Sequence, residues 1–165
     1  MKKLLILLLL FIVYFAHAQN MTNNSLQEII NQKADTIGGV MGNWKFIYKK
    51  IPMLCVTDEQ NNRMRIISPI TESANLDKDL LLDSMTANFH SALDVKYGIS
   101  NGILWSVYIH PLKELSSEQV ESAMSQVYYA AKNFGTTFSS TALLFGRRNT
   151  EEKKEEIKEK KTQKF

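Results

Sequence analysis

The stretch VKYGISNGILWSVYI, residues 95 to 109, carries the clearest local structural signal in the chain. Two runs rich in β-favouring residues, Val95 to Ile99 and Ile103 to Ile109, flank Ser100-Asn101-Gly102. An Asn-Gly pair readily adopts the positive φ angles that a tight hairpin turn requires. The stretch therefore predicts two antiparallel strands joined by a short turn.

Three further strands are expected upstream of this hairpin. Each is a short apolar or alternating run, which is typical of extended chain, and they span Trp44 to Lys49, Met53 to Thr57 and Arg63 to Ile67. Polar residues 58 to 62 supply the turn chemistry between the last two. Pro69 cannot donate a ladder hydrogen bond, so it is expected to end the extended region.

Capping signals and helical spacing of apolar residues predict three helices. The first begins at the capping box Ser25-Leu26-Gln27-Glu28 and ends near Gly38-Gly39. The second follows Asp77 and stops near Asp94, and the third follows Ser116 and runs to Gly135. Their apolar faces carry, in this order, Leu26, Ile29, Ile30 and Ile37; Leu82, Met85, Phe89 and Leu93; and Val120, Met124, Val127, Ala131 and Phe134.

These elements together predict an α+β fold. The expected order is α-β-β-β-α-β-β-α, with a five-stranded antiparallel sheet and helices packed on it. Residues Thr136 to Phe145 are rich in Ser, Thr and Phe, and periodicity assigns them neither to a strand nor to a helix.

The N-terminus has the pattern of a cleavable export signal. Lys2 and Lys3 precede the unbroken apolar run Leu4 to Ala16. The segment Ala16-His17-Ala18 has small residues at the positions that signal peptidase recognises. We expect a signal peptide over residues 1–18, cleavage before Gln19, and a periplasmic or secreted protein without a stable membrane anchor. The run is shorter than the roughly 20 apolar residues that span a bilayer; a retained N-terminal anchor is the alternative.

The remaining chain divides by composition into one domain and a tail. Residues 19–146 carry ten Lys and Arg against twelve Asp and Glu, and they are numerous enough to bury a core without disulfides. This charge balance argues against binding of nucleic acid. Residues 147–165 are almost all charged, with Ile157 and Phe165 as the only apolar side chains, so we expect a disordered tail.

No group of reactive side chains forms a catalytic or metal-binding pattern. Cys55 is the single cysteine, which excludes an intramolecular disulfide; a buried thiol is expected, with intermolecular pairing as the alternative. His90 and Asp94 are four residues apart on an expected helix, but no matching nucleophile accompanies them. The histidines left after cleavage fit no ligand spacing. We expect no enzymatic activity, no cofactor and no metal.

Several local segments carry a family resemblance together with the order of the elements. They are Arg63-Met64-Arg65-Ile66 leading into Ser68-Pro69-Ile70, Asn88 late in the middle helix, and Gly102-Ile103-Leu104-Trp105. Over roughly Ser25 to Phe134, the chain resembles the type III secretion chaperone-like fold, including the YbjN-type proteins. The resemblance implies a curved antiparallel sheet with packed helices, often dimeric, that binds other polypeptides. The chain departs from the secretion chaperones proper, which are cytosolic and typically acidic.

Both faces of several strands carry apolar residues, which is more than one layer of helices can cover. We expect a second sheet face that serves as an interface and bears Ile47, Arg63, Arg65, Ile67, Leu104 and Tyr108. An exposed apolar face of this kind is typical of contact with a protein partner or a second copy. The alternative is that residues 136–145 fold over it.

Three hypotheses for function follow. The first is an exported, non-enzymatic, chaperone-like module that binds protein through this face, also as a homodimer. The second is a small-ligand or lipid carrier in which Trp105 and Phe89 line a cavity between helices and sheet. The third is an enzyme centred on His90.

Overall fold

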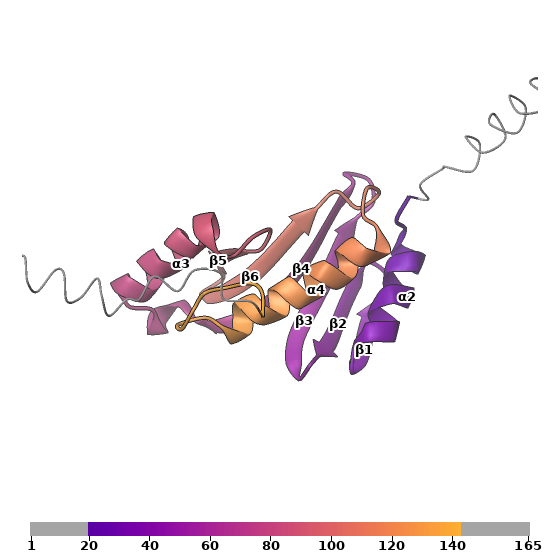
Figure 1. The fold of residues 1–165 in the computed structure, drawn as a ribbon. Helices are drawn as coiled ribbons and strands as arrows, with labels where there is room; N and C mark the ends of the chain where they lie inside the picture. Colours follow the sequence, from indigo (N-terminus) through magenta and orange to yellow (C-terminus); the bar gives the residue numbers. More distant parts are fainter. Residues whose placement is uncertain (1–19, 143–165) are drawn as a thin grey trace, which may run out of the picture.

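Figure 1 shows the computed structural model, which describes residues 20–142. The expected signal peptide, residues 143–146 and the charged tail lie outside the described residues. Within them the elements follow in the order α2 (Asn23–Lys33), β1 (Thr36–Val40), β2 (Asn43–Tyr48), β3 (Ile51–Asp58), β4 (Arg63–Glu72), a 3₁₀ turn η1 (Ser73–Asn75), α3 (Lys78–His90), β5 (Lys96–Ser100), β6 (Ile103–His110) and α4 (Ser117–Lys132).

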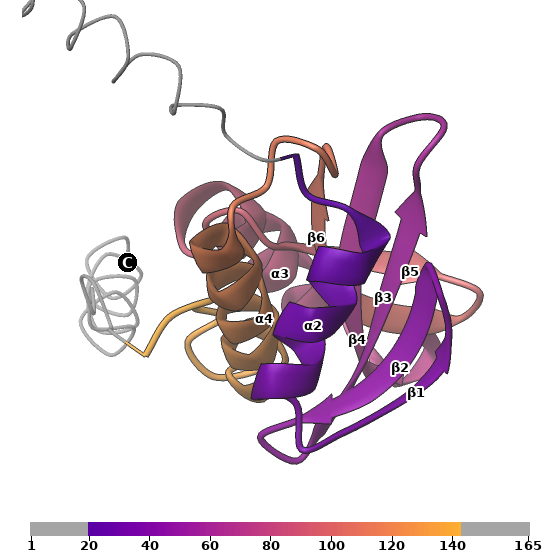
Figure 2. The same ribbon diagram turned by 90° about the vertical axis from the view of Figure 1, so that its right-hand side faces the viewer.

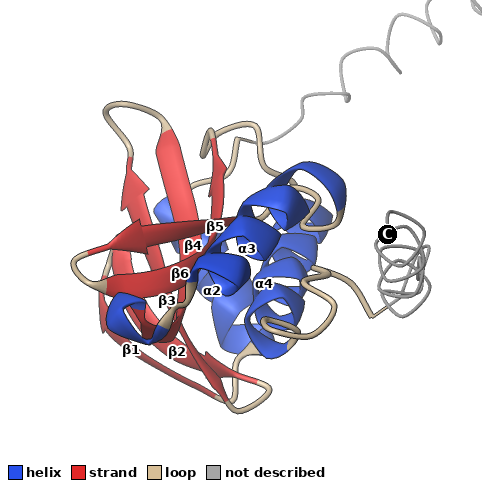
Figure 3. Cartoon of the chain, turned by 90° about the vertical axis from the view of Figure 1, so that its left-hand side faces the viewer, coloured by secondary structure: helices blue, strands red, loops and turns tan. Residues whose placement is uncertain are grey.

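The strands form one antiparallel sheet in the spatial order β1-β2-β3-β4-β6-β5. The helices gather on one side of this sheet, and its other side is bare of them (Figures 2 and 3). The α+β class and the antiparallel sheet are therefore as expected. The hairpin at residues 95–109 is confirmed as well, because Asn101 and Gly102 adopt φ angles of 51° and 74° between β5 and β6.

The sheet has six strands and not five, because residues 36–40 form β1 and do not continue the first helix. The pair Gly38-Gly39 resembles a helix stop signal, but α2 already ends at Lys33. Gly39 instead adopts a φ of 106° in the β1–β2 hairpin, where a Cβ atom would lie 2.3 Å from the Asn43 carbonyl oxygen. Only glycine fits at this close approach.

Several boundaries also differ from expectation, among them the end of α4, which is Lys132 and not Gly135. The capping box of α2 joins Thr22 and Ser25, so the helix begins at Asn23. Strand β4 continues past Pro69 to Glu72, and its register shifts between Pro69 and Thr71; an irregularity of this kind is where a sheet tolerates the missing proline N–H. Helix α3 ends at His90, a turn earlier than expected. The capping box of α4 at Ser116 and Gln119 is confirmed.

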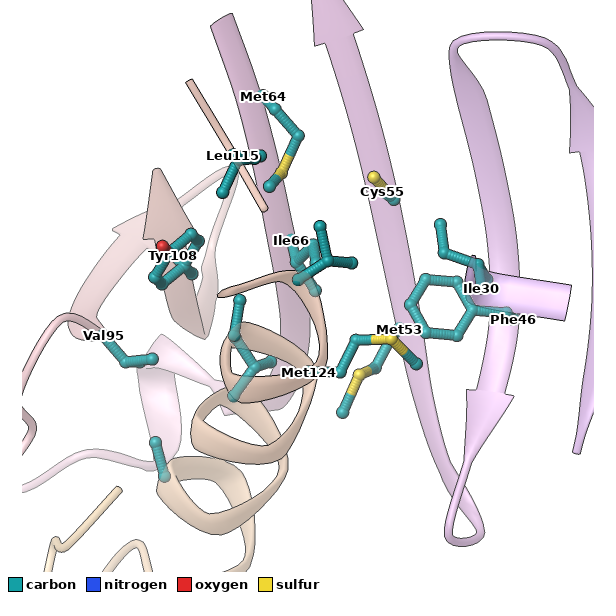
Figure 4. Packing of buried hydrophobic residues seen from close by; sticks show 14 of the residues in the cluster. Ile30, Phe46, Met53, Cys55, Met64, Ile66, Val95, Tyr108, Leu115 and Met124 are labelled. Carbon is teal, nitrogen blue, oxygen red and sulfur yellow. The ribbon is translucent and has the colours of Figure 1, made fainter. Parts of the chain in front are cut away.

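The core lies between the sheet and the helices. The inward side chains of β2, β3, β4 and β6 meet Ile30 of α2 and Met124 of α4, as Figure 4 shows. Ser68 and Ser106 are fully buried in the same layer. The Ser106 hydroxyl donates to the Val127 carbonyl oxygen of α4 at 3.2 Å. Small side chains in the adjacent strands β4 and β6 thus let α4 lie close to the sheet.

Residues 136–142, part of the stretch that the sequence left unassigned, contain neither helix nor strand. Phe138 is buried against Tyr97 and Phe134, with ring centroids 6.0 Å and 5.3 Å away. The Ser140 N–H donates to the Ser91 carbonyl oxygen at 3.2 Å. This segment therefore packs on the helical side, beside the end of α3, and does not fold over the bare face of the sheet.

We expect Ile66→Ala to lower the free energy of unfolding by about 2–5 kcal/mol, because it opens a cavity in the core. The matched variant Ile109→Ala should change it by less than about 1 kcal/mol, since Ile109 lies on the other face of the adjacent strand and is largely exposed. Urea unfolding of both variants measures the difference. Equal losses would contradict the assignment of the two faces.

Candidate protein-binding surface

The bare side of the sheet, called the open face here, carries a contiguous apolar patch. The patch consists of Ile47, Leu54, Val56, Ile67, Trp105, Val107 and Ile109. The strand register places one cross-strand row over it, Lys45–Leu54–Ile67–Val107–Lys96. Three aliphatic side chains in this row are therefore bracketed by two lysines.

A second row crosses the same face one step along the strands. Val56, Arg65 and Ile109 are direct register partners in β3, β4 and β6. The Arg65 side chain is exposed, and within residues 20–142 it takes part in no salt bridge. Its guanidinium thus stands among apolar side chains with its donors available to a ligand.

Trp105 widens the patch toward Pro69 and Gly98, its register partners in β4 and β5. The indole Nε1 donates to the Ser100 carbonyl oxygen at 3.2 Å, which holds the ring beside the β5–β6 turn. On the other side, a groove crosses β1 to β3, and its lining includes Gly38, Lys45, Ile47 and Leu54. The absence of a side chain at Gly38 leaves this end of the face hollowed.

The structure divides the residues expected on this face between the two sides of the sheet. Ile47, Arg63, Arg65 and Ile67 lie on the open face. The placement of Leu104 and Tyr108 there is wrong, because their exposed fractions are 1% and 5% and both point into the core. Tyr108 pairs with Ile66 and Leu104 with Thr71, so Trp105, Val107 and Ile109 take the open face. Burial and the nearby Asp94 carboxylate raise the pKa of Tyr108.

A second apolar surface lies on α3, where the sequence pattern indicated a buried face. Leu81, Leu82, Met85 and Phe89, called the α3 stripe, are all exposed, and the exposed fraction reaches 86% at Phe89. Inward, α3 presents only the small side chains Ser84 and Ala87 as buried residues. The expected face of Leu82, Met85, Phe89 and Leu93 is therefore not a core face: its first three members lie on the outer side of the helix, and Leu93 lies beyond the helix with a φ of 49° and is exposed.

Helix α3 is held to the edge of the sheet by polar contacts. The Asn88 side chain accepts from the Tyr97 N–H at 2.6 Å and donates to the Tyr97 carbonyl oxygen at 3.1 Å. One amide thereby satisfies both backbone groups of a residue in edge strand β5 and caps part of the exposed ladder. The stripe is left free to face outward.

The groups considered for catalysis do not come together. Because α3 ends at His90, Asp94 lies beyond the helix, where its carboxylate accepts from Gln126 Nε2 at 3.0 Å. His90 is exposed and contacts the Phe89 ring, with centroids 4.8 Å apart. Among residues 20–142 no three His, Cys, Asp or Glu side chains gather as metal ligands.

Two other expectations concern Cys55 and a carrier cavity. Cys55 is fully buried, and burial raises the pKa of its thiol to about 12, so the thiol is protonated and shielded. Trp105 lies on the open face and Phe89 on the outer side of α3. These two side chains therefore do not line a cavity between helices and sheet.

None of the helices in the described part of the chain has the length and apolar content for a membrane span.

Comparison with known proteins finds the same fold in solved structures only. Neither a protein-family model nor a curated protein matches the chain. Solved structures do match: a chain of the HopA1-SchA chaperone-effector complex aligns with 66% of this chain and 88% of its own length, with a TM-score of 0.52 and 12% identity.

Two further structures agree. The Yersinia pestis type III secretion chaperone SycH in complex with a stable fragment of YscM2 matches with a TM-score of 0.52 and 12% identity, over 69% of this chain and 100% of that chain. The ExsC-ExsE complex matches with a TM-score of 0.53 and 12% identity, over 67% and 87%. The chain thus has a type III secretion chaperone-like fold.

Proposed function

We propose that this protein is an exported, non-enzymatic chaperone-like module that binds segments of other polypeptides on its open face and pairs with a second copy through α3. The observation that carries the proposal is the contiguous apolar patch on a sheet face that its own helices leave bare. The proposal that the protein is exported rests on the signal pattern of residues 1–18. The proposal that it is related to the YbjN-type proteins rests on the sequence resemblance.

The open face suits an extended or amphipathic partner segment. Burying aliphatic side chains such as Leu54, Ile67 and Val107 contributes roughly 25 cal/mol for each Å² of apolar surface removed from water. A contiguous patch rimmed by polar groups is typical of protein interfaces. The matched structures support this function, because they are a chaperone-effector complex, a type III secretion chaperone bound to a fragment of YscM2, and the ExsC-ExsE complex.

The α3 stripe suits a second copy of the chain. Antiparallel packing of two α3 helices about a two-fold axis would place Phe89 of one copy near Leu81 and Leu82 of the other. It would also bring Lys78, at the start of one helix, to the C-terminal end of its partner, where a cation is favourable. Self-association through this stripe leaves both open faces accessible to clients.

We expect a photo-crosslinking amino acid at Ile109 to join the protein covalently to a different polypeptide in the cells that make it. The same amino acid at Ile99 is the matched control, since the two isoleucines have exposed fractions of 55% and 50% but lie on opposite sides of the sheet. Mass spectrometry of the adducts identifies the partner. Equal yields of the same adduct from both positions, or no adduct from position 109, would refute client binding at the open face.

The proposal also implies a dimer that Phe89→Ser weakens by about two orders of magnitude, because each dimer loses two buried phenyl rings. Sedimentation equilibrium of the mature protein gives the dissociation constant, with Ile109→Ser as control. Circular dichroism should show that the monomeric variant keeps its fold, since the Phe89 ring is exposed within one chain. A strictly monomeric wild-type protein would exclude this mode of pairing.

A further inference from the structure

The charges of the domain are unevenly distributed between its two sides. Over residues 19–146 acidic side chains outnumber basic ones, twelve to ten. The strand register places Lys45, Arg63, Arg65 and Lys96 on the open face, against Asp58 and Glu72. A domain with a net negative charge thus presents a positive face, and this face is also the apolar one.

The acidic groups of the open face do not neutralise its centre. The Asp58 carboxylate accepts from the backbone N–H and the side-chain amide of Asn61, at 3.0 Å and 2.8 Å, within the β3–β4 turn. Glu72 lies at the far end of β4, beyond the register shift at Pro69. Arg65 remains between Val56 and Ile109, and the described residues give it no carboxylate partner.

The basic side chains of the open face differ in whether they already donate hydrogen bonds within the chain. Lys96 donates to the Leu93 carbonyl oxygen, and Arg63 donates to the Asn62 carbonyl oxygen at 3.0 Å. Lys45 and Arg65 take part in no salt bridge among residues 20–142. These two cations bracket Leu54 and Val56 on neighbouring strands, so a carboxylate could reach either one while aliphatic groups beside it cover the patch.

A second copy is a poor occupant of the open face. Two-fold pairing of identical faces would bring together two surfaces that each carry more cations than carboxylates, where like charges repel. A basic client would meet the same repulsion. Charge complementarity therefore selects a partner with negative charge.

We propose that the client segment is acidic and apolar, with carboxylates interspersed among aliphatic side chains, and that Arg65 and Lys45 bind those carboxylates. This inference rests on the proposed function and specifies the chemistry of its partner. An arginine binds a carboxylate bidentately, and a charge-assisted hydrogen bond beside an apolar patch is stronger than a neutral one.

The test uses three short labelled peptides that share alternating Leu, Ile and Val residues and differ only in the intervening residues, which are Glu, Gln or Lys. Fluorescence anisotropy with the mature protein should show that the Glu peptide binds about tenfold or more tightly than the Gln peptide, and that the Lys peptide binds weakest. Raising NaCl from about 0.05 M to about 0.5 M should remove much of this preference.

Arg65→Glu should weaken binding of the Glu peptide by about tenfold or more and strengthen binding of the Lys peptide. Lys113→Glu is the matched control, because it makes the same change in charge on the loop before α4 and should leave both affinities unchanged. Circular dichroism confirms that both variants are folded.

The outcomes separate this inference from the function on which it rests. If all three peptides bind equally and Ile109→Ser weakens each of them, client binding at the open face stands and the acidic preference is wrong. If none binds, both are wrong. Binding to vesicles of phosphatidylglycerol that Arg65→Glu abolishes, without binding of the Glu peptide, would identify an anionic membrane surface as the partner and overturn the inference.

Discussion

The Ser106 hydroxyl donates to the Val127 carbonyl oxygen at 3.2 Å, and this contact holds α4 close to β4 and β6. Leu104 and Tyr108 lie on the same face of β6 as Ser106, so they also point into the core, where both are buried. Because side chains alternate along a strand, Trp105, Val107 and Ile109 must point the other way. The packing that forms the core thus also creates the apolar open face.

The domain has two exposed apolar surfaces, which differ in charge and in the secondary structure that carries them. On the open face Arg65 lies between aliphatic side chains of the sheet. The positive charge disfavours pairing of two open faces and favours an acidic segment. The α3 stripe sits on a helix fastened to the sheet edge by Asn88, and its apolar side chains suit a second α3. Assembly and client binding can therefore proceed on separate surfaces.

Local signals predicted the fold where one interpretation was physically possible. Asn101-Gly102 and the Ser116 capping box each admit a single structure, and both are confirmed. Arg63 and Arg65 alternate with Met64 and Ile66, so the outward side of β4 could be read directly. In β6 the side chains on both faces of the strand are mostly apolar, so the sequence does not show which face is buried. Only packing against α4 selects Leu104 and Tyr108 for the core. The α3 spacing gave a helix face but not its environment, and β1 was missed because Gly38-Gly39 resembles a helix stop.

The most direct test of the open face as a client-binding surface is methyl NMR of the mature protein with labelled Ile, Leu and Val. The added client would be reduced, carboxymethylated α-lactalbumin, an acidic chain that stays unfolded. We expect the methyl signals of Ile67, Val107 and Ile109 to shift or broaden, while those of Ile66, Leu104 and Val127, which lie on the core side, stay in place. Changes confined to Leu81 and Leu82 of α3, or no changes at all, would contradict it.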